Sequence, residues 1–191
     1  MKILVTAFEP FGGRSYNPSA ALLDLLPQTG DLEKLLLPVS YEGAARRLSE
    51  AIGKARPDAA VLTGLAGGRA EVCLEYAALN IKDGGGLPDN DGERAGGESV
   101  VPGAPNALFT ALDLASAVQR VRGVGVPCRV SYHAGTYVCN SIYFHLLSSG
   151  VPGVFIHIPD DLRSRPRDDA PYLPLDDSLR AVTEFLSFLR G

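Results

Sequence analysis

Short apolar runs alternate with amphipathic stretches along most of this chain. An uninterrupted apolar run is typical of a strand buried on both faces. Apolar positions three and four residues apart are typical of a helix packed against a sheet. These patterns predict short buried strands at 2–7, 59–63, 126–131 and 153–158, another strand at 33–39, and a longer, half-buried strand at 70–82.

The predicted helices lie between these strands. Asn17 is expected to cap the first helix, because Pro18 suits the first helical position and an apolar face follows it. Further helices are predicted at 41–55, near 106–121, from Cys139 onward, and near 175–189. Strands that alternate with helices in this way predict an α/β fold with a twisted, mainly parallel sheet and helices on both faces.

Length and composition favour one globular domain over residues 1–191. The chain is 46% hydrophobic and 21% charged, and it is long enough to bury a substantial core. Residues 83–105 are rich in Gly, Pro, Asp and Asn, so they are expected to form a functional or mobile loop with few apolar anchors.

The charge pattern and the cysteines narrow the function classes. The net charge is -4 without a basic cluster, so nothing indicates a nucleic acid or an anionic membrane as a partner. No apolar run is long enough to span a bilayer, and the first residues lead into a strand without a signal-peptide pattern. The three cysteines match neither a disulfide framework nor a zinc motif. These features predict a cytoplasmic protein with reduced thiols and no metal site.

Cys139 is the first candidate for chemistry. It follows the predicted strand at 126–131 and a turn at Gly135, and a helix is expected to begin beside it. Unpaired N–H groups and the positive end of the helix dipole would favour the nucleophilic thiolate and lower the pKa of this thiol. The alternative is that Cys139 is simply a small buried hydrophobic residue.

His157 is the candidate base, because it ends the buried strand at 153–158, and ligands in open α/β sheets bind beyond the carboxyl ends of strands. His133 and His145 are weaker candidates, and a structural role for His157 stays open. A base of this kind needs an orienting group. Glu75 lies in a mostly apolar stretch, so its carboxylate is expected to be buried and paired, whereas Glu71 is a poorer candidate.

Two glycine-containing loops follow predicted strands. The loop after the first strand carries Phe8 and Phe11, which either line a ligand site or fill the edge of the core. The turn 64–69 is similar to a phosphate-binding loop, but it lacks the Lys-Ser/Thr of a P-loop and opens no evident helix. Its small residues could instead allow another backbone or a ligand to approach closely.

Four segments together resemble the pyrrolidone-carboxylate peptidases, also called pyroglutamyl peptidase I. They are Phe8-Glu9-Pro10-Phe11-Gly12-Gly13 with Asn17-Pro18-Ser19, Gly67-Gly68-Arg69 followed by Glu75 and Asn80, Ala134-Gly135-Thr136-Tyr137-Val138-Cys139-Asn140, and Phe155-Ile156-His157-Ile158-Pro159. The resemblance implies a three-layer α/β/α sandwich and a cytoplasmic homo-oligomer, a tetramer or a dimer. It also implies a catalytic triad of Glu75, Cys139 and His157 without a cofactor.

The implied reaction is removal of an N-terminal pyroglutamyl residue from peptides. Phe8 and Phe11 are expected to form an apolar slot for the ring, and Asn17 and the turn at Leu65 are expected to supply polar partners. The chain departs from the family pattern at Leu65, where Gln is usual, at Tyr76, where Arg is usual, and near Gly85, where an Arg is replaced.

Two alternatives keep the fold and change the function. A nucleoside phosphorylase-like enzyme could hold phosphate at the turn 64–68 and would need no thiol. An inactive homologue that binds pyroglutamyl groups could result from the departures at Leu65, Tyr76 and Gly85.

Overall fold

A six-stranded sheet forms the centre of the molecule, and the computed structural model describes all of residues 1–191. In spatial order its strands are β2 (Leu32–Leu37), β1 (Ile3–Phe8), β3 (Ala59–Leu65), β10 (Gly153–Ile158), β4 (Val72–Glu75) and β9 (Cys128–Ser131). The first four are parallel, whereas β4 runs antiparallel to β10, and β9 is parallel to β4. The mainly parallel sheet is confirmed, with its last two strands reversed.

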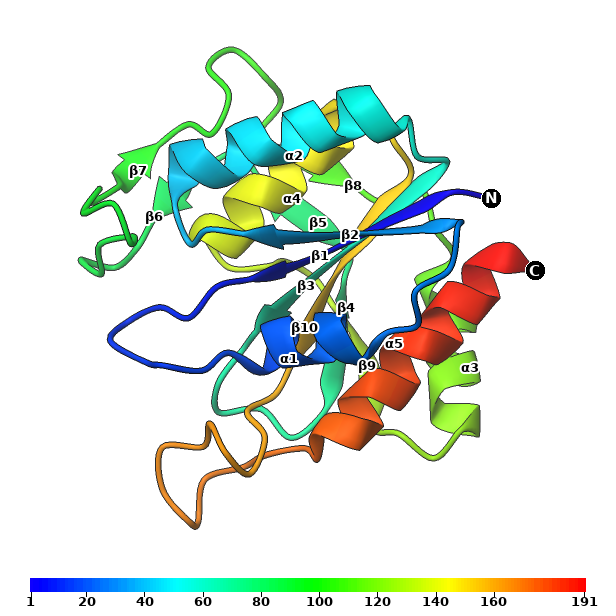
Figure 1. Ribbon diagram of the computed structural model, residues 1–191. Helices are drawn as coiled ribbons and strands as arrows, with labels where there is room; N and C mark the ends of the chain where they lie inside the picture. The colour runs from blue at the N-terminus through cyan, green and yellow to red at the C-terminus, as the bar shows by residue number, and fades with distance from the viewer.

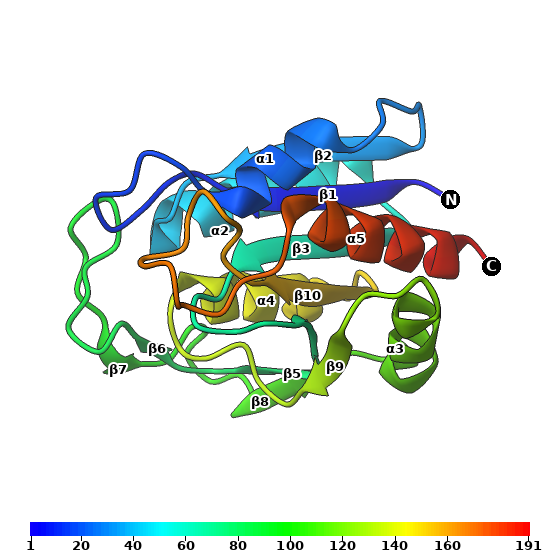
Figure 2. The same cartoon turned by 90° about the horizontal axis from the view of Figure 1, so that it is seen from below.

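Helices cover both faces of this sheet (Figure 1). One face carries α2 (Tyr41–Ala55) and α4 (Val138–Ser148), and the other carries α1 (Pro18–Leu25), α3 (Leu114–Gly123) and α5 (Leu175–Arg190). In Figure 2 the second group lies in front of the sheet. Alternate residues of each strand enter two separate cores, so Ile3 and Val5 pack on one side and Leu4 and Phe8 on the other. The α/β/α sandwich is therefore confirmed.

The first two helices begin at the predicted residues. Asn17 caps α1 by accepting a hydrogen bond from the backbone N–H of Ser19 at 3.0 Å, and Pro18 occupies the first turn. Ser40 caps α2 by accepting from the N–H of Gly43 at 3.1 Å. Each cap satisfies a backbone donor that the helix itself leaves unpaired.

The predicted long strand at 70–82 is wrong. It is divided into β4, β5 (Ala77–Leu79), which pairs with β8 (Ala107–Phe109), and β6 (Lys82–Asp83), which pairs with β7 (Gly96–Glu98). The chain leaves the central sheet at Tyr76, whose side chain is 40% exposed. Because 107–109 is used as a strand, the helix predicted near 106–121 begins only at Leu114, where Asp113 caps it.

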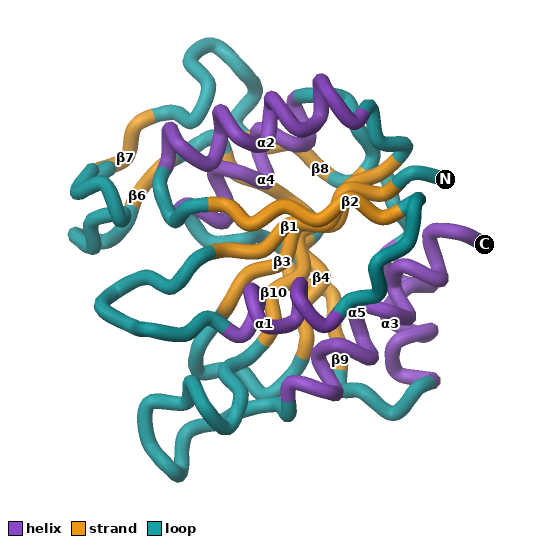
Figure 3. Tube along the Cα trace, in the orientation of Figure 1, coloured by secondary structure: helices purple, strands orange, loops and turns teal.

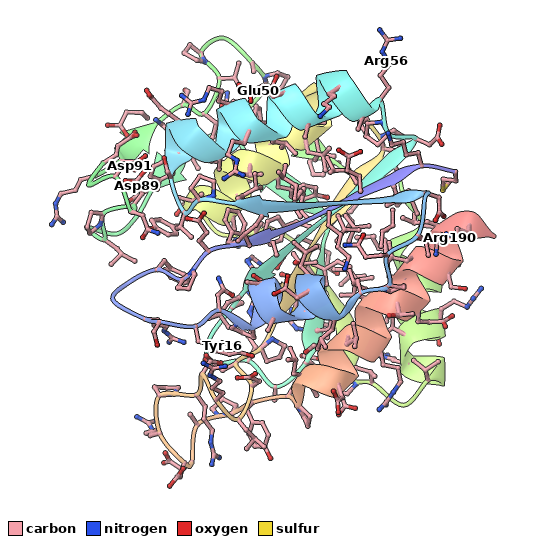
Figure 4. The ribbon with its side chains drawn as sticks, viewed as in Figure 1. Tyr16, Glu50, Arg56, Asp89, Asp91 and Arg190 are labelled. Carbon is pink, nitrogen blue, oxygen red and sulfur yellow. The ribbon has the colours of Figure 1, made fainter.

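Polar contacts anchor part of the loop 83–105, which the sequence predicts to be functional or mobile. The buried carboxylate of Asp89 accepts a hydrogen bond from the N–H of Tyr41 at 2.9 Å, at the start of α2 (Figure 4). Asn90 donates through Nδ2 to the carbonyl of Pro10 at 3.0 Å, and the Tyr137 hydroxyl donates to the carbonyl of Pro88 at 2.8 Å. These contacts hold part of the loop against the segments around the carboxyl end of β1.

None of the helices has the length and hydropathy needed to cross a bilayer.

Candidate active site

Glu75 and His157 are brought together by the antiparallel pairing of β4 and β10. Phe155 is opposite Glu75 in this register, and His157 lies two residues further along β10. The side chains of Glu75, Phe155 and His157 therefore project from the same face of the sheet. The Nδ1 atom of His157 lies 2.7 Å from Oε1 of Glu75. Both side chains are almost completely buried. The expected buried and paired carboxylate is thus observed, with His157 as its partner.

The thiol of Cys139 lies beside the same strands, in the first turn of α4. Gly64 of β3 is in register with His157 of β10, and a Cβ atom at position 64 would lie 3.2 Å from Sγ of Cys139. The ring of Phe155 would be nearer still, at 2.8 Å, so the ring and the sulfur both pack against this bare strand position. Gly64 allows the start of α4 to approach the sheet next to His157.

A pocket of about 220 Å³ opens over the thiol, and hydrophobic residues form most of its lining. It lies where the parallel strands β1, β3 and β10 end, and loops gather at this end of the sheet (Figure 3). Six of the residues proposed from the sequence line it, and they are Phe8, Phe11, Asn17, Leu65, Cys139 and His157. Glu75 lies behind His157 and does not line the pocket.

The side-chain amide of Asn17 makes three hydrogen bonds within the protein. Its Nδ2 atom donates to the carbonyl of Glu9 at 3.0 Å, and its Oδ1 atom accepts from both the N–H and the hydroxyl of Ser19. The residue is 2% exposed. Asn17 therefore holds the wall of the pocket in place, and the second hydrogen of its Nδ2 group is the only amide donor left for a ligand.

Sequence reasoning gave no individual role to several residues that line the pocket, among them Val39 and Tyr137. The ring of Tyr137 packs against Phe11, with centroids 6.5 Å apart, and edge-on against Tyr41 at 5.7 Å. Tyr137 precedes the first residue of α4, and its place next to Val138-Cys139 is the only signal that could have pointed to it.

The neighbourhood of Cys139 is not the tight strand–turn–helix expected from the sequence. Its preceding strand, β9, is the edge strand and runs opposite to β10, so its carboxyl end points away from the pocket. Residues 132–137 bring the chain back across the sheet before α4 begins, with a positive φ of 80° at Gly135. Within this segment, Nδ1 of His133 accepts from the N–H of Gly135 at 3.2 Å, and His133 is exposed.

The turn 64–69 has a packing reason for its small residues. The N–H of Ala66 donates to the carbonyl of Ile158 at 2.9 Å, and β4 follows without a helix. A Cβ atom at Gly67 would lie 2.8 Å from Oδ2 of Asp160. A glycine is thus needed for the close approach of this buried carboxylate, and the turn does not have the loop-to-helix layout of a phosphate-binding loop.

The three departures from the family pattern differ in their relation to the pocket. Leu65 lines it. Tyr76 stacks against Phe109 on the surface, with ring centroids 5.2 Å apart, and Gly85 lies in an exposed turn with a positive φ of 58°. Only the substitution at Leu65 changes the wall that a ligand would contact.

Burial controls the protonation of the site. It raises the pKa of the Cys139 thiol to about 12, and the nearby Glu75 carboxylate adds to this. The expectation that the start of α4 lowers this pKa is therefore wrong, because desolvation of the thiolate outweighs the helix end. Burial also lowers the pKa of His157, although its bond to Glu75 acts in the opposite direction. The resting pair is a neutral thiol and a neutral imidazole.

The carboxylate of Glu75 stays ionised beside this neutral pair. Burial alone would raise its pKa, but the hydrogen bonds with His157 and Ser131 and the contact with Arg69 outweigh burial and hold the pKa below the ordinary value. An ionised carboxylate accepts the Nδ1–H of His157 and so leaves Nε2 as a proton acceptor.

We expect Cys139 to be the first thiol that limiting iodoacetamide alkylates. All three cysteines are unpaired, and burial raises the pKa of each, so access decides the order. Cys73 and Cys128 are 0% and 1% exposed, whereas Cys139 lines the open pocket. Peptide mapping by mass spectrometry measures this order, and earlier labelling of Cys73 or Cys128 would contradict it.

The whole chain is similar to one family of peptidases. The family model for pyroglutamyl peptidase matches residues 1–187. The pyrrolidone-carboxylate peptidase of Thermococcus kodakarensis is 42% identical over 168 residues, which cover 83% of this chain and 81% of that protein. The pyrrolidone-carboxylate peptidase of Lactobacillus johnsonii is 36% identical over 199 residues, which cover 98% of this chain and 91% of that protein.

Solved structures agree with this assignment. Pyroglutamyl peptidase I of Bacillus amyloliquefaciens superimposes with a TM-score of 0.89 at 32% identity, covering 96% of this chain and 94% of that chain. A mutant pyrrolidone carboxyl peptidase of Pyrococcus furiosus superimposes with a TM-score of 0.90 at 32% identity, covering 98% and 97%. These matches support neither a nucleoside phosphorylase nor an inactive binding protein. The chain belongs to the pyroglutamyl peptidase family and is a cysteine-type hydrolase, a pyroglutamyl peptidase I.

Proposed function

We propose that this enzyme removes the N-terminal pyroglutamyl residue of peptides with Cys139 as nucleophile, His157 as general base and Glu75 as the residue that orients His157. The observation that carries the proposal is the 2.7 Å contact between Nδ1 of His157 and Oε1 of Glu75, next to a thiol at the bottom of an apolar pocket. A nucleophile, a base and a group that orients the base are the parts that acyl transfer through a thiol requires.

The first half of the reaction forms a thioester. Nε2 of His157 takes the thiol proton as the sulfur attacks the pyroglutamyl carbonyl, and Glu75 stabilises the imidazolium that results. Because the resting thiol is neutral, this proton transfer accompanies the attack and no stable thiolate precedes it. The imidazolium then gives its proton to the leaving amine, and the C–N bond breaks.

The second half hydrolyses the thioester. The same imidazole removes a proton from water, the hydroxide adds to the acyl carbon, and the sulfur leaves with the proton from His157. Free pyroglutamate and the resting thiol result. Each tetrahedral intermediate carries a negative oxygen that needs hydrogen-bond donors.

Backbone N–H groups in the first turn of α4 are the candidate donors. No side chain caps this helix at Tyr137, so its first N–H groups lack an intrahelical partner and lie beside the sulfur. A donor of this type commonly lowers the barrier by about 3 kcal/mol. The start of α4 does not lower the pKa of the resting thiol, but its N–H groups stabilise the negative charge that develops on the carbonyl oxygen during the reaction.

The pyroglutamyl ring is proposed to lie between Phe8 and Phe11. Both line the pocket; Phe8 is 2% exposed, and Phe11 is half-buried against Tyr137. The lactam N–H and C=O need polar partners, and the Asn17 amide has one Nδ2 hydrogen left to offer. Leu65 has no polar side chain, so main-chain groups at the end of β3 and in the segment 134–138 are the proposed partners.

We expect Phe11→Ala to reduce kcat/KM for a pyroglutamyl amide by about tenfold or more. The reason is lost ring burial, which is worth roughly 1.5–3 kcal/mol for a side chain of this size. Tyr172→Ala is the matched control, because Tyr172 is an aromatic residue that is 36% exposed and lies outside the pocket lining. Equal kcat/KM values for Phe11→Ala and wild type would contradict this pocket.

Turnover of a chromogenic pyroglutamyl amide tests the proposed function directly. The wild-type protein should release the chromophore, and alkylation of Cys139 should stop the release. A protein that still turns over after complete alkylation of Cys139 would not use the thiol. Binding of the substrate without any release would mean that the site no longer supports the chemistry.

We also propose that the enzyme acts in the cytoplasm as a homo-oligomer of two or four chains. Three unpaired cysteines suit a reducing compartment. Three aromatic side chains are exposed near β9 and the β5–β8 pair, at the edge of the sheet. They are Tyr132, Phe109 and Tyr76, which are 76%, 58% and 40% exposed. Together they offer an apolar surface for contact with another copy of the chain. Light scattering with size-exclusion chromatography measures the number of chains.

A further inference from the structure

The carboxylate of Glu75 has a second partner besides His157. Nη1 of Arg69 lies 3.1 Å from Oε1, the same oxygen that is in contact with His157. The Glu75 side chain is 0% exposed, whereas that of Arg69 is 29% exposed. Arg69 belongs to the segment between β3 and β4, so it reaches the carboxylate from a loop. Oε1 of Glu75 therefore contacts both the imidazole of His157 and the permanently charged guanidinium of Arg69.

Arg69 is the only permanently charged partner of this carboxylate. The ion pairs of Glu75 are with Arg69 and His157, and an imidazole is charged only when it is protonated. The second oxygen, Oε2, is buried and makes no ion pair; the neutral hydroxyl of Ser131 also helps to hold the pKa of this carboxylate down but adds no charge. A buried carboxylate without a compensating cation takes up a proton or draws one onto its neighbour. In the absence of Arg69, that neighbour would be His157.

The remaining titratable groups around His157 carry no charge at neutral pH. Apart from Glu75 and Arg69, they are Cys139 and Tyr143 of α4, and Cys73, which is opposite His157 in the register of β4. Burial raises the pKa of all three. On the β3 side, the residue in register with His157 is Gly64, which has no side chain. The charge balance at His157 therefore depends on Glu75 and Arg69.

We propose that Arg69 is a positioning residue for the proposed reaction: its guanidinium balances the buried carboxylate of Glu75, so that His157 rests as a neutral base. The inference rests on the proposed roles of Glu75, Cys139 and His157. Arg69 does not line the pocket and acts on the substrate only through Glu75. It also fixes the carboxylate against the imidazole, because both donors share one oxygen.

The test is the pH dependence of kcat/KM for a pyroglutamyl amide in Arg69→Gln. Removal of one positive charge makes it easier to add a proton to the Glu75–His157 pair, whichever residue holds it. The acid limb should therefore move to higher pH by about one unit, and kcat/KM at a fixed pH below the limb should fall about tenfold. The loss should appear in kcat, with KM within about twofold of wild type, because no pocket contact is removed.

Two further variants separate charge from structure. Arg69→Lys keeps the charge and should keep the acid limb near its wild-type position. Arg129→Gln is the matched control, because Arg129 pairs with Glu71 at 2.9 Å near the same sheet edge and touches no residue of the triad. It should leave the limb unchanged. An Arg69→Gln variant with a lower Tm but a wild-type acid limb and kcat would overturn the inference and leave the proposed triad intact.

An NMR titration of the His157 ring tests the same inference without a measurement of turnover. The chain has only three histidines, so the His157 ring can be assigned by NMR from the His133→Ala and His145→Ala variants. The wild-type midpoint should lie below the ordinary histidine value, and the Arg69→Gln midpoint should lie above that of wild type. If Arg69→Gln does not fold, a wild-type midpoint at or above about 6.5 overturns the inference. Loss of the proposed function would appear separately, as turnover that survives Cys139→Ala.

Discussion

We expect Cys139→Ala and His157→Ala each to reduce kcat/KM for a pyroglutamyl amide by more than about a thousandfold. Without the sulfur no thioester forms. Without the imidazole the thiol stays neutral, since burial raises its pKa to about 12. Both groups serve one transition state, so the double variant should be little worse than either single variant. Steady-state kinetics on the three variants, with folding checked by circular dichroism, measure this.

Controls for this result come from the same chain. His133→Ala removes an exposed histidine outside the pocket, and Cys128→Ala removes a thiol that is 1% exposed in the opposite core. Both should retain near-normal kcat. Glu75→Gln should lose less than Cys139→Ala, because an amide oxygen still accepts the Nδ1–H of His157 but stabilises the imidazolium less. A near-normal kcat in His157→Ala would mean that another group is the base.

The second large effect concerns the substrate ring. We expect pyroglutamyl amides to be cleaved with a kcat/KM about 10⁴-fold above that of prolyl amides. Proline has the same ring size but lacks the lactam carbonyl, so it leaves polar main-chain groups of the pocket without a partner. Its secondary amine is also protonated at neutral pH, and the pocket lining contains no carboxylate to receive the charge.

Glutaminyl amides provide the complementary comparison, because glutamine has the side-chain carbonyl but an open chain and a charged amine. They should be as poor as prolyl amides. Competition assays with one leaving group in all three substrates isolate the contribution of the acyl group. Comparable cleavage of prolyl and pyroglutamyl amides would refute the proposed lactam contacts, and the triad assignment would be unaffected.

The sequence predicts much of this architecture because local signals and burial agree there. The observed bounds of α2 equal the predicted 41–55, since Ser40 is a strong cap and the apolar positions keep a helical period. The short strands β1, β3 and β10 are apolar on both faces, which leaves little ambiguity. The closeness of Glu75 to His157 follows from a simple rule, that a buried carboxylate needs a partner.

Features that depend on distant contacts could not be predicted in this way. The reversal of β4 and the end of that strand at Tyr76 are decided by pairing with β10 and β9, which lie far along the chain. Cys139 does lie in the first turn of a helix, as the sequence predicts. The predicted low pKa of its thiol is wrong because the surrounding fold desolvates the thiolate. The hydrogen bond from the Asn17 amide to the carbonyl of Glu9 likewise depends on how the loop after β1 folds back.

The bare strand position at Gly64 has a consequence for enzyme design. The ring of Phe155 and the sulfur of Cys139 both pack over Gly64, which is in register with His157, and a side chain at this strand position would displace them. A graft of the three reactive side chains onto another α/β scaffold would therefore be incomplete. The recipient must also have a glycine on the strand beside the base, with a helix start directly above it, or the nucleophile will be held too far from its proton acceptor.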